Sequence, residues 1–359
     1  MQQPNEPVIS APHGIFVVGK TPVAIASKPN ARQLFVANQD SPFLTYIDLV
    51  TQRALPIEVR ARGCNALLYH AATDAVIAAT VAGSLIYLDT ERGRVLDEIV
   101  VHDSYFRMHP RENGEELIIV RGTRLSIFNI GLRKMRQDLD LKAEIGLVVE
   151  LDRRTALVEL RGSSARDSST LVVMDLDAGS CLATLPIPSL APGQLVSSQA
   201  RGRLYLTNSR TGQLHVLDTS LRLLASLAIG DLPTTLAFAR VDSRLCVACR
   251  REVVVLDTDN LDVLGRIARR QGGAGLVYDP SSDVVYTLNQ ATISIEAIAM
   301  ESYQRVAIME SHVARTGDVI DGSTLFDAQN RILAIASAGS TNSREEFFHD
   351  GVLAVFDAL

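Results

Sequence analysis

A short segment recurs along the whole length of this chain and limits the folds open to it. It reads LFVAN at 34–38 and LYLTN at 204–208, and GSLIYLDTE at 83–91 returns as GQLHVLDTS at 212–220. An anchor residue ends each apolar run, and successive anchors are 39 to 58 residues apart. The anchors are Asp48, Asp89, Asn129, Asp175, Asp218, Asp257, Ala299 and Asp357. Such spacing falls near the ~40–50 residues of a propeller blade and indicates eight units.

Each unit contains four short runs rich in apolar and β-branched residues. In the fifth unit they lie at 194–198, 203–208, 213–218 and 223–229, with turn residues between them. Four strands without an intervening helix make one propeller blade. The sequence therefore predicts an all-β protein, a single eight-bladed β-propeller of four-stranded antiparallel blades. We expect the anchor aspartates to bond the backbone two residues on and so shape the following turn.

The chain ends are expected to meet in the last blade. One propeller domain over 1–359 is predicted, with blades at about 21–61, 62–101, 102–143, 144–189, 190–230, 231–270, 271–310 and 317–359. The last unit stops at Leu359 without an outer strand, whereas HGIFVVGKTP at 13–22 matches the outer-strand segment ASLAIGDLP at 225–233. We expect residues 13–20 to complete that blade, which would hide two sheet edges.

The segments LFVAN, LYLTN and VYTLN, with VGKTP and IGDLP, resemble YVTN-type β-propeller repeats. That superfamily includes surface-layer proteins, lactonase-like propellers and a streptogramin-lyase-like branch. The resemblance covers essentially the whole chain and implies a fold, but it says little about chemistry. The chain has no tryptophan, which disfavours WD-repeat and quinone-dependent dehydrogenase propellers. It also has no C-x-x-C-H motif for covalent haem.

Composition excludes several classes of protein. A net charge of −6 argues against a nucleic-acid binder, which would present a basic face. No apolar run reaches the ~20 residues of a membrane helix, and MQQPNEPVIS lacks the features of a secretory signal. A cytoplasmic protein is therefore expected. Cys246 and Cys249 would point to opposite faces of one strand, so we interpret the cysteines as buried, inert thiols.

Three insertions fall on one predicted face of the propeller. They lie at 161–170, 310–322 and 337–351, in the fourth and last units. Units four and eight lie opposite one another in a ring of eight, so these loops are expected to cover the mouth of the central channel. The alternative is that they are tolerated surface loops.

Two arginines interrupt a row of small polar residues at the ends of the second strands. Arg121 and Arg161 are assigned to the position that Asn38 and Asn208 occupy in other units. A pair of guanidinium groups there would suit a carboxylate or phosphate. The alternative is that each arginine reaches solvent or pairs with a carboxylate such as Glu144.

The remaining candidates come from loops on the same predicted face. We expect His102 to lie beside Arg121, where it could act as a general base. We expect Phe347 and Phe348 to close over a ligand or to contact another protein. The predicted catalytic residues are His102, Asp103, Glu144 and His349. The predicted ligand-binding residues are Arg121, Arg161, Arg62, Lys20, Arg270, Asp321, Arg344, Phe347 and Phe348. No recognised metal-ligand spacing is present, so neither a metal nor another cofactor is expected.

Two functional hypotheses follow. The first is a cofactor-independent hydrolase, lyase or isomerase, similar to the lactonase-like branch, that binds a small anionic metabolite at the channel mouth. The second is a non-catalytic scaffold for protein–protein interaction, in which the loop at 337–351 docks a protein partner. Neither hypothesis involves nucleic acid or a membrane, and the sequence leaves the oligomeric state open.

Overall fold

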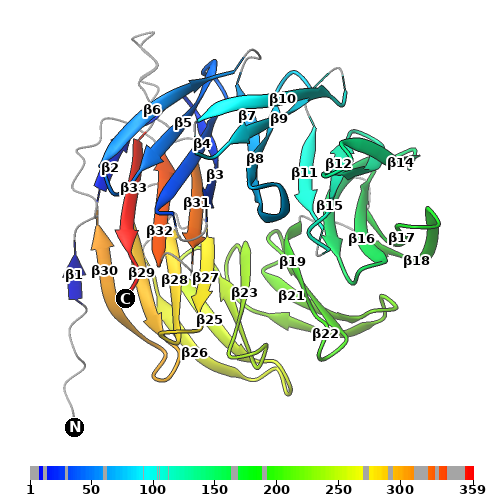
Figure 1. Cartoon of the computed structure of the whole chain (residues 1–359). Coiled ribbons are helices and arrows are strands. Elements are labelled where there is room, and N and C mark those ends of the chain that lie inside the picture. The colour runs from blue at the N-terminus through cyan, green and yellow to red at the C-terminus, as the bar shows by residue number, and fades with distance from the viewer. Residues whose placement is uncertain are drawn as a thin grey trace, which may run out of the picture. The chain divides into compact units, whose positions relative to one another are not determined.

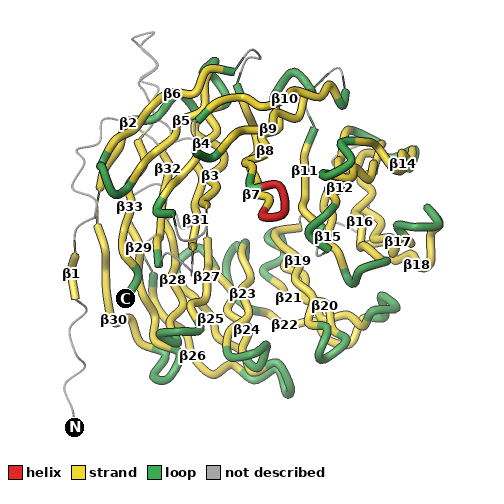
Figure 2. The backbone as a smooth tube through the Cα atoms, viewed as in Figure 1, coloured by secondary structure: helices red, strands yellow, loops and turns green. Residues whose placement is uncertain are grey.

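The structure is a computed structural model and describes most of the chain. The described residues are 8–10, 14–28, 31–59, 63–91, 93–102, 104, 106–111, 113–162, 169–187, 192–269, 275–289, 294–310, 322–327, 331–337 and 352–359. Strands account for almost all of the regular structure (Figure 2), and one short 3-10 helix spans Ala71–Thr73. The protein is an all-β, eight-bladed propeller of four-stranded antiparallel blades, as predicted. Within the described residues, no helix is long and apolar enough to cross a membrane.

The blades fall into two compact units. The first unit comprises Met1–Arg107 and Arg270–Leu359, and the second comprises Met108–Arg269. Blades one, two, seven and eight belong to the first unit, and blades three to six to the second.

In the first unit, each blade is built from four strands consecutive in the chain, except where the N-terminal segment contributes. Blade one contains β3 (Pro22–Lys28), β4 (Gln33–Asn38), β5 (Phe43–Asp48) and β6 (Arg53–Glu58). Blade two contains β7 (Cys64–His70), β8 (Ala75–Thr80), β9 (Ser84–Asp89) and β10 (Arg94–Val100). Blade seven contains β27 (Gly275–Asp279), β28 (Val284–Asn289), β29 (Ser294–Ala299) and β30 (Gln304–Glu310), with β1 (Val8–Ser10) added. Blade eight contains β31 (Gly322–Asp327), β32 (Ile332–Ser337), β33 (Val352–Asp357) and β2 (Gly14–Val17).

The second unit repeats the same order without exception. Blade three contains β11 (Arg107–Pro110), β12 (Glu116–Arg121), β13 (Arg124–Asn129) and β14 (Lys134–Asp140). Blade four contains β15 (Glu144–Glu150), β16 (Thr155–Arg161), β17 (Ser169–Asp175) and β18 (Ser180–Ile187). Blade five contains β19 (Pro192–Ser198), β20 (Arg203–Asn208), β21 (Gln213–Asp218) and β22 (Leu223–Ala228). Blade six contains β23 (Thr235–Ala239), β24 (Arg244–Ala248), β25 (Glu252–Asp257) and β26 (Val263–Ala268).

The N-terminal segment completes blade eight, as predicted, and also extends blade seven. Strand β2 pairs antiparallel with β33, with Gly14 opposite Val355 and Val17 opposite Val352. Strand β1 pairs in parallel with β30, a contact that the sequence did not suggest. Figure 1 shows β1 beside β30 and β2 beside β33. The outer edge of a blade in this protein can therefore accept a fifth strand.

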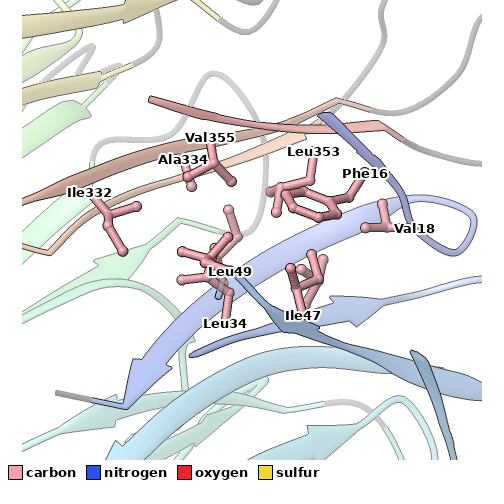
Figure 3. Close-up of a cluster of buried hydrophobic side chains, with 11 residues drawn as sticks. Phe16, Val18, Leu34, Ile47, Leu49, Ile332, Ala334, Leu353 and Val355 are labelled. Carbon is pink, nitrogen blue, oxygen red and sulfur yellow. The ribbon is translucent and has the colours of Figure 1, made fainter. Parts of the chain in front are cut away.

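The core lies between neighbouring blades. Strand residues alternate between the two faces of each sheet, so within each unit the facing sides of neighbouring blades are apolar. Between blades eight and one, Phe16 and Val18 pack with Ile47 and Leu353 (Figure 3). Similar clusters join blades one and two, three and four, four and five, five and six, and seven and eight.

The anchor residues shape the turns between the third and outer strands, as expected. The Asp48 carboxylate accepts hydrogen bonds from the backbone N–H groups of Val50 at 2.8 Å and Thr51 at 3.1 Å. Asp89, Asp175, Asp218 and Asp257 each accept a backbone hydrogen bond from the residue two positions on. Asn129 bonds the N–H of Leu132 at 2.8 Å instead. These aspartates are structural, although they are the most regular acidic residues of the sequence.

Substitution of Asp48 tests this assignment through pH. Backbone N–H groups, that of Thr51 foremost, lower the pKa of the Asp48 carboxyl below its ordinary value. A depressed pKa in the folded state stabilises the fold above the unfolded-state pKa, and this contribution disappears as pH falls through the folded-state value. Asp48→Ala should cost about 1 kcal/mol at neutral pH, whereas Asp48→Asn keeps the acceptor and should lose only the acid dependence. Urea unfolding at pH 7 and pH 3 measures both, and equal losses for the two variants would contradict the assignment.

Candidate functional site

Five of the predicted site residues lie among the described residues. They are His102, Glu144, Arg121, Arg161 and Lys20. The other predicted residues lie outside the described part of the chain: Asp103, His349, Arg62, Arg270, Asp321, Arg344, Phe347 and Phe348. Most of each insertion lies outside it as well. The site at the channel mouth therefore remains a prediction from sequence.

The two arginines do not occupy equivalent positions, contrary to the sequence prediction. In each blade, the first residue of the second strand pairs with the anchor residue. Asn208 lies five positions after that residue in blade five, and Arg121 lies five positions after it in blade three. In blade four this position is Leu160, and Arg161 comes one residue later because β16 is longer. Successive strand residues point to opposite faces of a sheet, so the two arginines project from opposite faces of their blades. The register thus separates groups that we expected to act as a pair.

Arg161 is held by a carboxylate that the sequence analysis did not consider. Its Nε lies 3.8 Å from Oε2 of Glu159, which shares its sheet face and is almost completely buried. Glu159 also accepts hydrogen bonds from the backbone N–H of Leu147 at 3.1 Å and from Oγ of Ser169 at 2.8 Å. Glu144 lies directly opposite Arg161 in the ladder and is exposed. This arrangement fits the alternative in which the arginine pairs with a carboxylate.

Glu159 supports an irregularity in the inner strand of blade four. The register of β15 shifts between Ile145 and Val148, and a Cβ at Gly146 would lie only 2.1 Å from Oε2 of Glu159. Thr207 supports the corresponding irregularity in blade five, where its hydroxyl oxygen accepts a hydrogen bond from the backbone N–H of Gln194 at 2.8 Å. The recurrence indicates that Glu159 fixes a bulge rather than taking part in a reaction.

The backbone groups of His102 and Lys20 are both held by hydrogen bonds. The backbone N–H of His102 donates to the carbonyl of Gly83 at 3.0 Å, and its ring meets the buried ring of Phe106 edge-on at 6.0 Å. The backbone N–H of Lys20 donates to Oγ of Ser41 at 2.8 Å. Within the described residues, no group of three or more histidine, cysteine, aspartate or glutamate side chains is arranged to hold a metal ion.

The cysteines are thiols, and three of the four match the prediction of buried, inert groups. Cys64, Cys246 and Cys249 are buried, and burial raises the pKa of each thiol, to about 12 for Cys246. Cys181 is the exception, since it is exposed on β18. It lies on the outermost strand of its blade, where the side chains are less covered than on the inner strands.

A buried ion-pair network joins blades three and four and was missed by the sequence analysis. The Arg111 guanidinium lies 2.6 Å from Oε2 of Glu116 and 2.9 Å from Oε1 of Glu150. It also donates to the carbonyl of Arg153. Arg136 extends the network, 2.9 Å from Oε1 of Glu116. Nothing in the local sequence at 108–116 shows that Arg111 is buried, because two of its partners, Glu150 and the carbonyl of Arg153, come from blade four.

Hollows open where the outer strands of neighbouring blades splay apart. A cavity of about 610 Å³ lies between β6 of blade one and β10 of blade two. Others of about 480 Å³ and 180 Å³ lie between blades three and four and between blades eight and one. Register shifts in the outer strands, such as that between Val95 and Asp97, increase the local twist and help to part the sheets.

The largest of these hollows combines apolar and acidic side chains, and we call it the blade 1–2 groove. Ile57, Val59 and Ile86 line its base and are buried. Glu58 and Glu98 line it too and are exposed. Glu98 pairs directly with Ile86 across the ladder, so both side chains lie on the sheet face that meets blade one.

Comparison with known proteins identifies the fold and no family. No family model matches the sequence, and no curated protein matches it. The computationally designed Ika8 protein has a TM-score of 0.71 at 15% identity, covering 98% of this chain and 100% of Ika8. Sqt1 of Saccharomyces cerevisiae has a TM-score of 0.72 at 12% identity, covering 98% of this chain and 100% of that one. The C-terminal WD40 domain of Sif2 has a TM-score of 0.72 at 12% identity, covering 98% and 99%.

These similarities extend to a WD40 domain although this chain lacks tryptophan. The absence of tryptophan therefore argues against the WD-repeat sequence pattern, but it does not exclude the backbone fold that WD40 domains share. At 12–15% identity the likeness shows the fold alone.

Proposed function

We propose that this protein is a non-catalytic platform for protein–protein interaction. The blade 1–2 groove carries the proposal, because it combines an apolar base with the carboxylates of Glu58 and Glu98, which form no ion pair with any described residue. The outer strands also present exposed leucines for apolar contacts, such as Leu96, whose side chain is 49% exposed, and Leu223, which is 54% exposed. The fold shared with Sqt1 and the Sif2 domain implies no particular reaction.

The enzymatic hypothesis has less support. It needs Arg121 and Arg161 to converge on one anion, whereas the strand register directs them to opposite sheet faces. The YVTN-type resemblance remains compatible with both functions, since it concerns repeat architecture. A metabolite-binding site at the channel mouth stays a prediction from sequence, since most of its predicted residues lie outside the described part of the chain.

Photo-crosslinking from the outer strands tests the platform. Benzoylphenylalanine is placed at Leu96, Leu182 or Leu223, one position per variant, in cells that produce the protein. Each leucine is exposed, so the fold should tolerate the change. We expect discrete adducts with the same partner protein from repeated experiments at one or more positions. Only diffuse adducts at every position, together with a small anion that stabilises the wild type but not Arg121→Ala/Arg161→Ala, would contradict the platform and favour an enzyme.

A further inference from the structure

The blade 1–2 groove carries more acidic than basic charge. Among the described residues that line it, Glu58, Asp97 and Glu98 are acidic and Arg94 is the basic residue. Arg94 already lies 3.7 Å from a carboxylate oxygen of Asp89. Within the described part of the chain, neither Glu58 nor Glu98 forms an ion pair. The carboxylates of Glu58 and Glu98 thus have no cationic partner among the described residues.

The charge of Glu98 acts on the interior of the groove. Burial, followed by the negative charge of Glu98, raises the pKa of the Cys64 thiol to about 12. Cys64 belongs to the apolar cluster between blades one and two, together with Ile57 and Ile86. Val95 pairs with Leu88 of that cluster and lies on the same sheet face. A cation on an aliphatic stem would therefore meet both parts of the groove, its stem against apolar side chains and its charge at the carboxylates.

The backbone beside the groove is also available. Strand β10 is the edge strand of blade two, so its outer backbone groups have no strand partner among the described residues. The protein itself adds β1 to the equivalent edge of blade seven. β6 carries Pro56, which cannot donate a hydrogen bond to an added strand, whereas β10 has no proline and its register shift is confined to Val95–Asp97.

We propose that the edge of β10 binds an extended basic segment of a partner protein, whose lysine or arginine side chains enter the blade 1–2 groove. The segment adds as a fifth strand, and every second side chain faces blade one because of the period of two. Main-chain hydrogen bonds hold the segment. Glu98, on the sheet face of Ile86, selects for positive charge, and Glu58 at the end of β6 adds to the negative potential. This inference rests on the proposed interaction function and specifies the chemistry of the partner.

A synthetic peptide of alternating lysine and valine, seven residues long, serves as the probe, and its glutamate–valine counterpart as the control. Fluorescence anisotropy of the labelled peptides against the full chain measures the Kd. Glu58→Gln/Glu98→Gln should weaken binding of the lysine peptide about fivefold, and added salt should weaken it further. The matched variant Glu115→Gln/Glu301→Gln removes the same charge from exposed turns and should bind like the wild type.

Hydrogen exchange locates the peptide. The lysine peptide should slow amide exchange across Arg94–Val100, which no general attraction to an acidic protein would do. Equal affinity for the two variants, equal binding of the glutamate peptide, or unchanged exchange in β10 would overturn the proposal. If crosslinking then still gave a discrete partner from Leu182 or Leu223, the interaction function would stand and only this site would fall.

Discussion

Replacing Arg111 with methionine should lower the free energy of unfolding by about 3–5 kcal/mol. The Arg111 side chain is 2% exposed, and it compensates two carboxylates that are themselves 10% and 8% exposed. Removal takes the guanidinium away from the buried carboxylate of Glu150, whereas Glu116 keeps its contacts with Arg136 and Asn113. A buried charge without its partner is far more costly than the pair is stabilising, because water no longer solvates it. Urea unfolding of the full chain measures the loss.

Arg136→Met is the matched control for this prediction. Arg136 belongs to the same network, but its side chain is 39% exposed, so its loss should cost about 1 kcal/mol or less. A triple variant, Arg111→Met with Glu116→Leu and Glu150→Leu, removes the charges together and should recover most of the stability lost in the single variant. Similar losses for Arg111→Met and Arg136→Met would show that burial does not decide the contribution of this network.

The sequence predicted the blade architecture because the relevant signals are local. Alternating apolar residues define strands such as β20, and an aspartate that bonds the backbone two residues on defines the next turn. Both act within a few residues, and eight repetitions make the pattern unmistakable. The closing strand was predicted for the same reason, since the segment at 13–22 repeats the outer-strand pattern of other blades.

The candidate site was predicted less well because it depends on register and on contacts between blades. Because β16 has one additional residue, Arg161 lies one position later in its strand than Arg121 does in β12. The repeat pattern does not show which strand contains the additional residue. Glu159 reads as an ordinary residue of an apolar run, and only the bulge opposite it explains its burial. The blade 1–2 groove is formed by strands some forty residues apart in the chain, so no local sequence pattern predicts it.

Replacing Phe16 with alanine should destabilise the first unit by about 3–5 kcal/mol. Phe16 is 5% exposed in β2, where it faces Leu353 across the ladder and packs with Val18 and Ile47 (Figure 3). Truncation would leave a cavity at the junction of blades eight and one and weaken the strand that covers the edge of β33. We therefore expect a lower thermal midpoint and, since an uncovered edge can pair with other chains, more aggregation during unfolding.

The neighbouring residue provides the control for Phe16. Val17 lies on the same strand but is 65% exposed, so Val17→Ala keeps the strand and removes no core packing. Its effect should stay within about 0.5 kcal/mol. Scanning calorimetry with light scattering records both variants under the same conditions. If Phe16→Ala unfolded at the wild-type temperature, β2 would not contribute to stability, and closure of blade eight would have to depend on β31, β32 and β33 alone.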